Sequence, residues 1–246
     1  MKRFEGKTAL VTGAAVGIGR TTAVKLASEG ARIVALDLNG EKLATLQEEI
    51  EAAGGKVLTL VCDIADEAAV NQAVAKAVEQ FGTIHILINN AALWRDSSWF
   101  LDTSVETWKK YLDINVMGVV YCTRAVLPGM LAAGYGRIVN VASVAGVYGN
   151  AKMVHYSATK GALISMTAAL AKEVCDKGVI VNAVSPGTVS PADNSDYCYV
   201  QESAMNYMGR TGSDMENANL ICFLASEESS YISGQNIQID GSRKKI

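Results

Sequence analysis

Short apolar runs alternate with longer amphipathic stretches along the whole chain, and this alternation constrains the fold more than any other feature. The apolar runs occupy residues 7–12, 31–37, 56–63, 84–90, 136–143, 178–187 and 234–240. The longer stretches predict helices over residues 17–30, 40–54, 67–82, 104–133 and 155–177. Strands that alternate with helices are typical of parallel strands joined by crossover helices, and uninterrupted apolar strands indicate a sheet covered on both faces. We therefore expect an α/β fold, a doubly wound parallel sheet of about seven strands in one domain over residues 1–246.

The composition argues against several classes of protein. The net charge of −3, without long runs of like charge, offers no basic surface for nucleic acid. No run of about 20 apolar residues is present to span a membrane, and the first residues lack the apolar stretch of a signal peptide. Five scattered cysteines without a CxxC pair, and only two histidines, predict neither a disulfide framework nor a metal site. We expect a protein of the reducing cytoplasm with no nucleic-acid or membrane partner.

A glycine-rich turn follows the first apolar run and precedes the first predicted helix. It contains Gly13, Gly17 and Gly19. Glycine permits positive φ and a close approach of backbone to a ligand, and a helix N-terminus offers unpaired N–H groups to a pyrophosphate. Tight packing alone could explain such a turn, but the first strand–helix turn of an α/β chain is where dinucleotides bind. The turn therefore predicts a dinucleotide site.

Acidic residues end the next two predicted strands. Asp37 follows the glycine turn by about 20 residues, the position from which a carboxylate binds the adenosine ribose hydroxyls and repels a 2′-phosphate. Residues 14–16 contain no Arg or Lys to hold such a phosphate, so we predict NAD(H) in preference to NADP(H). Asp63 could bind the adenine amino group. Helix capping by Asp37, Asn39 or Asp63 is the alternative role.

Tyr156 and Lys160 are four positions apart in a predicted helix. Residues at this spacing share one helix face, and a nearby cation lowers the pKa of a phenol from its usual value of about 10. A lysine together with a second positive charge could make Tyr156 a proton donor and acceptor near neutral pH. The alternative is a packed tyrosine beside a solvated lysine.

The least regular segment spans residues 188–210. It is rich in polar and turn-forming residues, and aromatic and Met side chains lie between them: Tyr197, Tyr199, Met205 and Tyr207. Loops of this length are usually functional or disordered. We interpret it as a substrate loop that suits a large apolar ligand, although the same side chains could pack the loop down or line a subunit contact.

The ordered set of motifs resembles the short-chain dehydrogenase/reductase family over the full length of the chain. The matching pieces are "TGAAVGIG", Asp63, "NNAA" at 89–92, Asn115 in "DINVMG", Ser143 in "NVASVAG", "YSATK" and "SPGTV". The resemblance implies a Rossmann-type sheet and an NAD(H)-dependent oxidoreductase that transfers a hydride between nicotinamide and a secondary alcohol or ketone. It also implies a homo-oligomer, a tetramer or dimer.

The resemblance further assigns roles to individual residues. Tyr156 would be the general acid/base, Ser143 would bind the substrate oxygen, Lys160 would bind the nicotinamide ribose and lower the pKa of Tyr156, and Asn115 would hold a water for proton relay. The cofactor contacts that it implies are Gly13, Ala15, Gly17, Ile18, Gly19, Asp37, Leu38, Asp63, Ile64, Asn90, Ala91, Ala92, Tyr156, Lys160, Pro186, Gly187 and Val189. The substrate contacts are Trp94, Arg95, Ser143, Ala145, Asn150, Met153 and Tyr156.

Some positions depart from the family pattern, and other functions stay open. Ala92 replaces a usual glycine, and His85 a frequent acidic residue. A noncatalytic NAD(H)-binding regulatory module and a 3-oxoacyl-carrier-protein reductase are the alternatives, and Asp37 argues against the second. A sugar-nucleotide epimerase also uses a Tyr–Lys pair, but such chains are usually longer.

Overall fold

The computed structural model describes residues 2–190 and 196–244, and in this part of the chain seven parallel strands form one sheet. The strand order is β3-β2-β1-β4-β5-β6-β7. The strands are β1 (Thr8–Thr12), β2 (Arg32–Asp37), β3 (Lys56–Val61), β4 (Ile86–Asn89), β5 (Gly136–Val141), β6 (Val179–Pro186) and β7 (Asn236–Ile239). The predicted doubly wound parallel sheet is confirmed.

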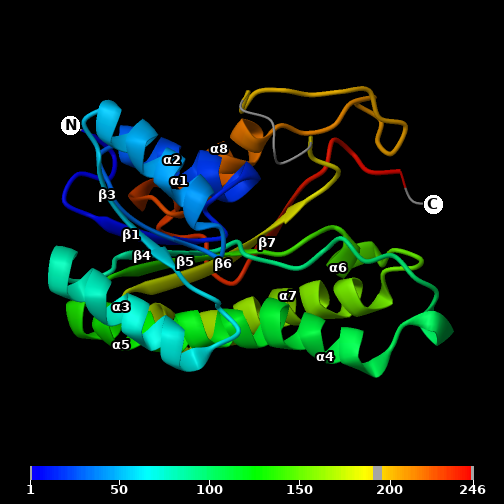
Figure 1. Cartoon of the computed structure of the whole chain (residues 1–246), viewed down its shortest axis with the longest axis horizontal. Helices are drawn as coiled ribbons and strands as arrows, with labels where there is room; N and C mark the ends of the chain where they lie inside the picture. Colours follow the sequence, from blue (N-terminus) through cyan, green and yellow to red (C-terminus); the bar gives the residue numbers. More distant parts are fainter. Residues whose placement is uncertain (1, 191–195, 245–246) are drawn as a thin grey trace.

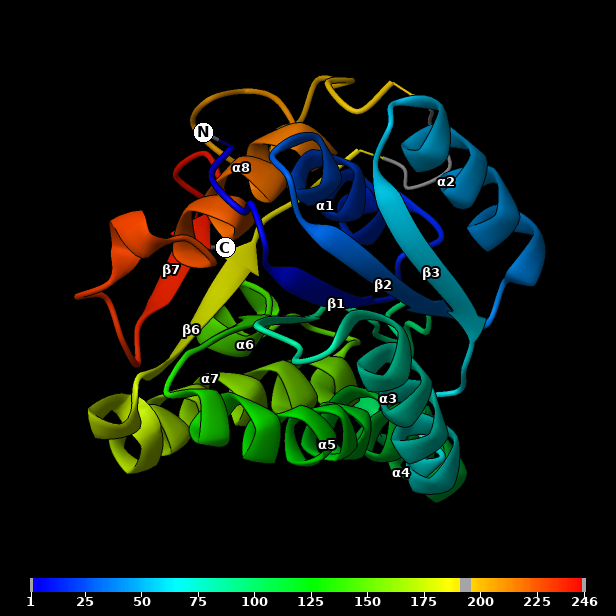
Figure 2. The same ribbon diagram turned by 90° about the vertical axis from the view of Figure 1, so that its left-hand side faces the viewer.

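Helices cover both faces of the sheet (Figures 1 and 2). One layer contains α1 (Gly17–Ser28), α2 (Gly40–Ala52) and α8 (Asp214–Leu224). The other contains α3 (Glu67–Phe81), α4 (Val105–Leu112), α5 (Gly118–Ala133), the short α6 (Ala145–Tyr148) and α7 (Val154–Val174). Figure 2 shows the strands fanning between the two layers, from β3 at one edge to β7 at the other.

Neighbouring residues of one strand contribute to two different cores. Val11 and Ile33 belong to the apolar cluster beneath α1 and α2, whereas Leu10 and Val34 belong to the cluster beneath α3 and α5. Successive side chains of a strand point to opposite faces, so a strand between two helical layers needs apolar residues at every position. This requirement explains the uninterrupted apolar runs of the sequence.

Three features of the helices differ from the prediction. The helix expected over residues 104–133 contains a π-helical turn, Asp113–Met117, between α4 and α5. A π turn adds one residue to a helical turn and leaves no mark in the apolar periodicity. The short α6 was not predicted, nor was α8, although a capping box of Ser213 and Glu216 begins α8 and is a readable start signal.

The run Val105–Ala133 is also long and apolar enough to cross a membrane by length and composition. The sequence prediction had found no such stretch. In the structure the run packs against α3, α7 and the sheet, and a third of its most apolar window is buried. Core packing therefore accounts for part of its apolar character, and the absence of a membrane partner stays a prediction.

A buried polar network connects the centre of the sheet to the layer of α5 and α7. The Asn89 amide donates to Asn140 Oδ1 at 2.9 Å, and the Asn140 amide donates to Thr167 Oγ1 at 2.9 Å. All three side chains are buried. Buried polar groups are costly when a partner is lost, so Asn140 fixes the position of α7 on β5.

We predict that Asn140→Ala lowers the free energy of unfolding by about 2–3 kcal/mol, because the buried Asn89 and Thr167 side chains each lose a hydrogen bond with the Asn140 side chain. Urea unfolding followed by circular dichroism measures the change. Asn71→Ala, at an exposed position of α3, is the control and should shift stability by less than about 0.5 kcal/mol. Equal, small effects of the two substitutions would show that the network does not stabilise the fold.

Candidate active site

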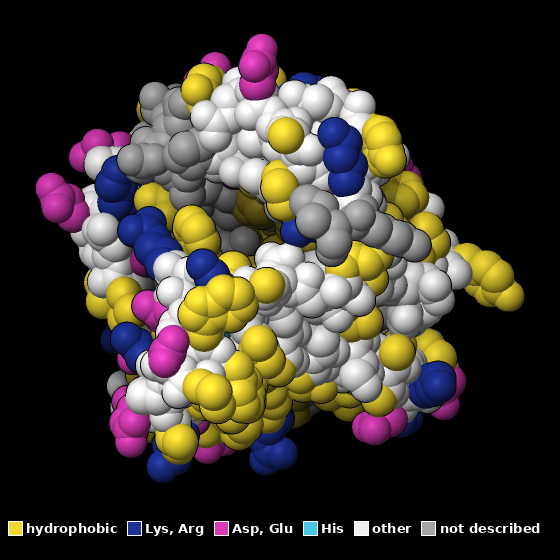
Figure 3. All heavy atoms as spheres, turned by 90° about the vertical axis from the view of Figure 1, so that its right-hand side faces the viewer, with side chains coloured by type: hydrophobic (Ala, Val, Ile, Leu, Met, Phe, Trp, Pro, Cys, Tyr) yellow, Lys and Arg dark blue, Asp and Glu magenta, His cyan; other side chains and the backbone are white. Residues whose placement is uncertain are grey.

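A cleft of about 1030 Å³ lies at the carboxyl edge of the sheet. It is bordered by residues that follow β1, β2, β4, β5 and β6. Successive strands are added towards β3 on one side of β1 and towards β7 from β4 onwards, so the strand order reverses between β1 and β4. Ligands of open α/β sheets bind at such a switch point. Figure 3 shows the hollow from outside, with Lys and Arg side chains beside its opening.

The glycine turn forms one wall of the cleft and fits a phosphate-bearing ligand. Gly17 has φ of +57°, which disfavours other residues. A Cβ on Gly13 would lie 2.8 Å from Ala91 Cα, so a side chain cannot be placed there. Val16, the N-cap residue of α1, gives no side-chain cap. The N–H groups of the first turn therefore stay available to an anion.

Asn90 joins the turn after β1 to the end of β4. Its side-chain amide donates to the carbonyl oxygens of Thr12 and Gly13, each at 3.0 Å. Gly19 packs beneath this junction, because a Cβ there would lie 2.1 Å from Gly13 O. Gly19 thus shapes the turn from behind and does not line the cleft.

Asp37 and Asp63 both line the cleft. Asp37 Oδ2 accepts a hydrogen bond from Ala15 N, and Oδ1 accepts one from Asn39 N, both at 3.0 Å. Ala15 itself is buried and does not line the cleft. Asn39 caps α2, as one alternative reading proposed. The alternative cap role of Asp63 is wrong, because Asp66 caps α3.

Lys160 and Tyr156 both line the cleft from α7. Lys160 Nζ lies 5.8 Å from the centre of the Tyr156 ring and donates to Val141 O at 2.7 Å. The lysine side chain is 2% exposed. Burial disfavours the charged form of an amine and lowers the pKa of Lys160 to about 7. The alternative of a solvated lysine is therefore wrong.

Lys160 alone does not lower the pKa of Tyr156. Burial raises the pKa of the phenol above its usual value of 10, and a hydrogen bond from Ser143 opposes this effect. The expected fall in this pKa combined Lys160, as a full positive charge beside the phenol, with a second positive charge. The ammonium instead binds the Val141 carbonyl, and burial weakens its own charge. The chain's own residues thus leave Tyr156 protonated at neutral pH.

Asn115 lies behind the cleft rather than in its lining. Its Oδ1 accepts from Leu93 N at 2.7 Å, and its Nδ2 donates to Leu93 O and Thr159 Oγ1 at 2.9 and 3.1 Å. Both amide N–H groups are therefore used by protein partners. The π turn brings this side chain to the loop after β4, where it forms hydrogen bonds with the backbone of Leu93.

Most of the residues that the resemblance implied do border the cleft. Those that line it are Gly13, Gly17, Ile18, Asp37, Leu38, Asp63, Ile64, Asn90, Ala91, Ala92, Trp94, Arg95, Ser143, Asn150, Met153, Tyr156, Lys160, Pro186, Gly187 and Val189. Ala145 does not line it: its N–H donates to Ser143 Oγ at 3.1 Å and orients that hydroxyl.

The sequence did not indicate several residues that line the cleft, among them Lys110, Asp214 and Arg243, whereas Gln201 lies in the predicted substrate loop. Asp214 is the first residue of α8 and is buried, and burial raises the pKa of its carboxyl to about 6. Lys110 lies shortly before the motif that contains Asn115, and Arg243 lies near the end of the described residues. Only the topology of the fold brings them together.

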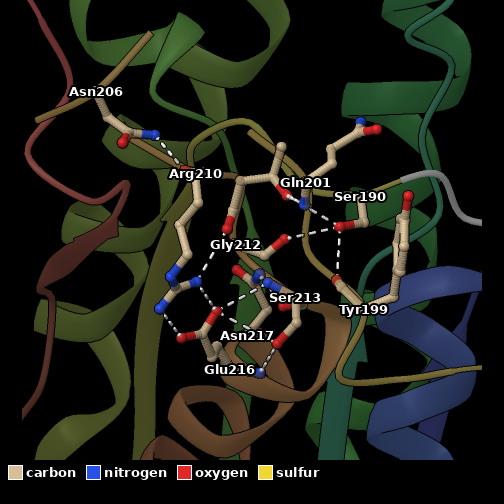
Figure 4. A network of polar contacts seen from close by, with 10 residues as sticks. Ser190, Tyr199, Gln201, Asn206, Arg210, Gly212, Ser213, Glu216 and Asn217 are labelled. Carbon is tan, nitrogen blue, oxygen red and sulfur yellow. Dashed lines mark hydrogen bonds and ion pairs between the residues drawn. The ribbon is translucent and has the colours of Figure 1, made fainter. Parts of the chain in front are cut away.

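The described ends of the predicted substrate loop are held against the start of α8 (Figure 4). Ser190 Oγ donates to Tyr199 O at 2.6 Å, and Arg210 forms an ion pair with Glu216 at 2.7 Å. This pairing lowers the pKa of Glu216 to about 2. The middle of the loop, 191–195, lies outside the described residues.

A second attachment of the same loop reaches the helices beside the glycine turn. Tyr197 Oη lies 3.0 Å from Arg20 Nε, which donates to it, and 2.9 Å from Glu49 Oε2. Arg20 and Glu49 also form an ion pair at 2.7 Å. The packing role that the sequence left open therefore applies to Tyr197.

The sequence is similar to those of known proteins over nearly the whole chain. The family model described as short chain dehydrogenase matches residues 7–198. A 3-oxoacyl-[acyl-carrier-protein] reductase of Thermotoga maritima is 40% identical over 242 residues, 97% of this chain and 98% of that protein. A 2-dehydro-3-deoxy-L-rhamnonate dehydrogenase (NAD(+)) of a Sphingomonas species is 38% identical, with 98% and 96% coverage.

A cyclohexanol dehydrogenase of an Acinetobacter species is 35% identical over 97% of this chain and 95% of that protein. Among solved structures, NAD+-bound xylitol dehydrogenase superposes with a TM-score of 0.90 and 34% identity, covering 98% of this chain and all of the other.

The burial of Lys160 predicts how the stability of the protein depends on pH. An unfolded lysine has a pKa of about 10.4, whereas that of Lys160 is about 7. Between these pH values the unfolded chain binds more protons, so stability should rise with pH. Below pH about 7 both states are charged, and the full burial penalty is present. We predict that the free energy of unfolding of Lys160→Met exceeds that of the wild type by the largest amount at low pH. This difference should disappear as the pH rises to about 10.

Urea unfolding of the cofactor-free proteins at several pH values measures this difference in stability. The other titrating groups are the same in both proteins, so their contributions cancel. Lys172→Met, at an exposed position of the same helix, is the control and should parallel wild type. Parallel curves for Lys160→Met and wild type would contradict the assignment of the shifted pKa.

Proposed function

The chain belongs to the short-chain dehydrogenase/reductase family, and on that premise we propose that it transfers a hydride between NAD(H) and a secondary alcohol or ketone. Enzymes of this family are oxidoreductases that act on CH–OH or carbonyl groups with a nicotinamide cofactor, so this chain is an enzyme of that class. The observation that carries the proposal is one cleft with Tyr156, Ser143 and Lys160 on one side and an uncapped helix N-terminus on the other.

The chain's own residues would handle the proton. When bound, the cofactor supplies or accepts the hydride, and the protein supplies orientation and electrostatics. In the reduction direction, the Tyr156 hydroxyl would give its proton to the carbonyl oxygen as that oxygen gains negative charge. In the protein's own surroundings the phenol is protonated at neutral pH, so the proton to be donated is present, and a lower pKa in the loaded cleft would make its transfer easier.

Ser143 would hold the substrate oxygen near Tyr156. Its hydrogen bond favours the tyrosinate form and so lowers the pKa of Tyr156, while Ala145 N fixes the serine oxygen. Lys160 would bind the nicotinamide ribose and return to the charged state when that contact replaces lost water. We propose for Asn115 a positioning role through Leu93, in place of the expected side-chain contact to a relay water.

We propose NAD(H) as the preferred cofactor. Asp37 lines the cleft, and its two oxygens are held by backbone N–H groups. A carboxylate fixed in this way would accept hydrogen bonds from ribose hydroxyls and repel a 2′-phosphate. Two of the relatives, the rhamnonate dehydrogenase and the xylitol dehydrogenase, carry NAD+ in their names or titles, which agrees with this preference.

A second candidate follows from the 40% identity to the 3-oxoacyl-[acyl-carrier-protein] reductase. Such a function would require the cleft to admit a long acyl thioester. A noncatalytic regulatory module is less favoured, because all four members of the proposed tetrad are present. A homo-oligomer and a cytoplasmic location remain predictions.

We predict that Tyr156→Phe folds and binds NADH but loses turnover by about 10²–10⁴-fold, the usual contribution of a general acid/base. Turnover of a panel of alcohols and ketones, followed at the NADH absorbance, gives the loss, and NADH fluorescence gives binding. Tyr231→Phe, at a fully exposed position, is the matched control. Turnover of Tyr156→Phe close to that of the control would remove Tyr156 from the mechanism.

We also predict a higher kcat/KM with NADH than with NADPH, and that Asp37→Asn shifts this ratio towards NADPH by at least about 10-fold, because opposed like charges cost several kcal/mol. Asp63→Asn is the control, since the adenine that it would face is common to both cofactors and the ratio should stay unchanged. A preference for NADPH in the wild-type enzyme would contradict the role of Asp37.

A further inference from the structure

The cleft has opposite charge at its two ends. Asp37 and Asp63 line the end beside β2 and β3, where the adenosine would lie. Three cations, Arg95, Lys110 and Arg243, line the end formed by the loop after β4, by α4 and by the C-terminal segment. The catalytic group would act between these ends, so the cations surround the substrate rather than the adenosine.

Arg243 is the most firmly placed of the three. Its Nη2 donates to Asn150 Oδ1 at 2.9 Å. Asn150 N in turn donates to Ser157 Oγ at 3.1 Å, and Asn150 O accepts from Met153 N at 3.2 Å. The same short segment continues into α7, which carries Tyr156. The guanidinium is therefore held on the segment that also positions the reacting hydroxyl.

The backbone around Arg243 is held as well. Asn206 and Arg243 form an antiparallel bridge, and Tyr207 N donates to Ser242 O at 3.0 Å. The C-terminal segment is thus fixed to the described end of the predicted substrate loop. This arrangement reduces the entropy that Arg243 would lose on binding a ligand.

None of the three cations has an acidic partner within residues 2–190 and 196–244. Other arginines do form ion pairs: Arg20 with Glu49, Arg137 with Glu227, and Arg210 with Glu216. Arg243 is instead held by a neutral amide, and Arg95 lies over the Trp94 ring. An ion-paired arginine would be neutralised, whereas these charges stay available to a ligand.

Two acids near this end have to be weighed against the cations. Asp96 is exposed, and its N–H donates to the Tyr111 hydroxyl at 3.1 Å. Asp214 lines the cleft from α8, in the layer of α1, while Lys110 and Asn150 belong to the opposite layer (Figure 1). Neither acid forms an ion pair with a cleft cation in the described part of the chain.

We propose that the substrate carries an oxyanion, a carboxylate or a phosphate, which Arg243 binds while Tyr156 and Ser143 engage its hydroxyl or carbonyl group. This proposal rests on the proposed oxidoreductase function and specifies its substrate class. Arg243 suits the contact because a guanidinium binds carboxylate or phosphate oxygens in a bidentate manner. Arg95 and Lys110 are exposed and would attract the anion to the opening.

Matched pairs of compounds test the proposal with the intact enzyme and NAD+. One set of compounds tests a carboxylate: lactate, 3-hydroxybutanoate and 4-hydroxypentanoate, each compared with its neutral amide. This set is the carboxylate arm, and 2-hydroxypropyl phosphate is the phosphate arm. We expect an anion to exceed its neutral counterpart in kcat/KM by at least about 10-fold, the usual worth of a charged hydrogen bond. The better arm identifies the oxyanion.

Substitutions test the assigned residue. Arg243→Gln should lower kcat/KM for the anion by at least about 10-fold and leave the amide nearly unchanged, and Arg243→Lys should recover part of the loss. Lys244→Gln is the matched control, since this neighbouring cation lies over Tyr207 and does not line the cleft. Equal turnover of acid and amide by the wild-type enzyme would overturn the proposal, as would an equal loss for both in Arg243→Gln.

Measurements of ligand binding distinguish a failure of the anion site from a failure of the proposed oxidoreductase function. Calorimetry with the enzyme, NAD+ and each acid or amide reports the contact without turnover. If no alcohol or ketone is turned over but acids bind more tightly than amides and Arg243→Gln abolishes the difference, the anion site stands and the proposed function fails. If turnover occurs and binding shows no preference for the anion, the proposed function stands and the anion site fails.

Discussion

A lysine ammonium buried against a main-chain carbonyl is the constraint on which the site depends. Lys160 reaches from α7 across the end of β5 to Val141 O, and the surroundings exclude water. A charge in such a place is unstable unless other groups compensate for its lost hydration. The lost hydration of Lys160 lowers stability, but the lysine lies in a cleft where the hydroxyl groups of a bound ligand would supply the missing hydrogen bonds. The same feature explains why the Tyr156 phenol is not acidified by the chain alone.

The arrangement of strands and helices determines how the charge of the lining residues changes along the cleft. The turn after β1 and the end of β4 meet through the Asn90 amide, which places the uncapped start of α1 beside the carboxyl edge. From there the lining changes from acids near β2 and β3 to cations near α4 and the C-terminal segment. Tyr156 lies between these regions. A cofactor whose adenosine ribose lies at the acidic end and an anionic substrate at the other end would match this order of charge.

Much of this arrangement could be predicted from the sequence. The uninterrupted apolar strands required helices on both faces, and the glycine spacing required a ligand-approaching turn. Three details could not be predicted, and a fourth, the start of α8, was readable but missed. The π turn at Asn115 changes the helix by one residue, which periodicity does not register. The contact of Arg243 with Asn150 joins residues 93 positions apart, which only the topology defines. The start of α8 carried a readable capping box that was missed. The direction of the Tyr156 pKa depends on burial, which spacing along a helix does not report.

The central claim is that the Tyr156 phenol becomes acidic only when positive charge and hydrogen bonds are added to the cleft beside Lys160. Ultraviolet difference titration of phenolate absorbance, in wild type minus Tyr156→Phe, measures that pKa directly. With NAD+ present we expect the midpoint assigned to Tyr156 to fall by at least about one pH unit relative to the cofactor-free protein. A midpoint that NAD+ leaves unchanged would contradict the account.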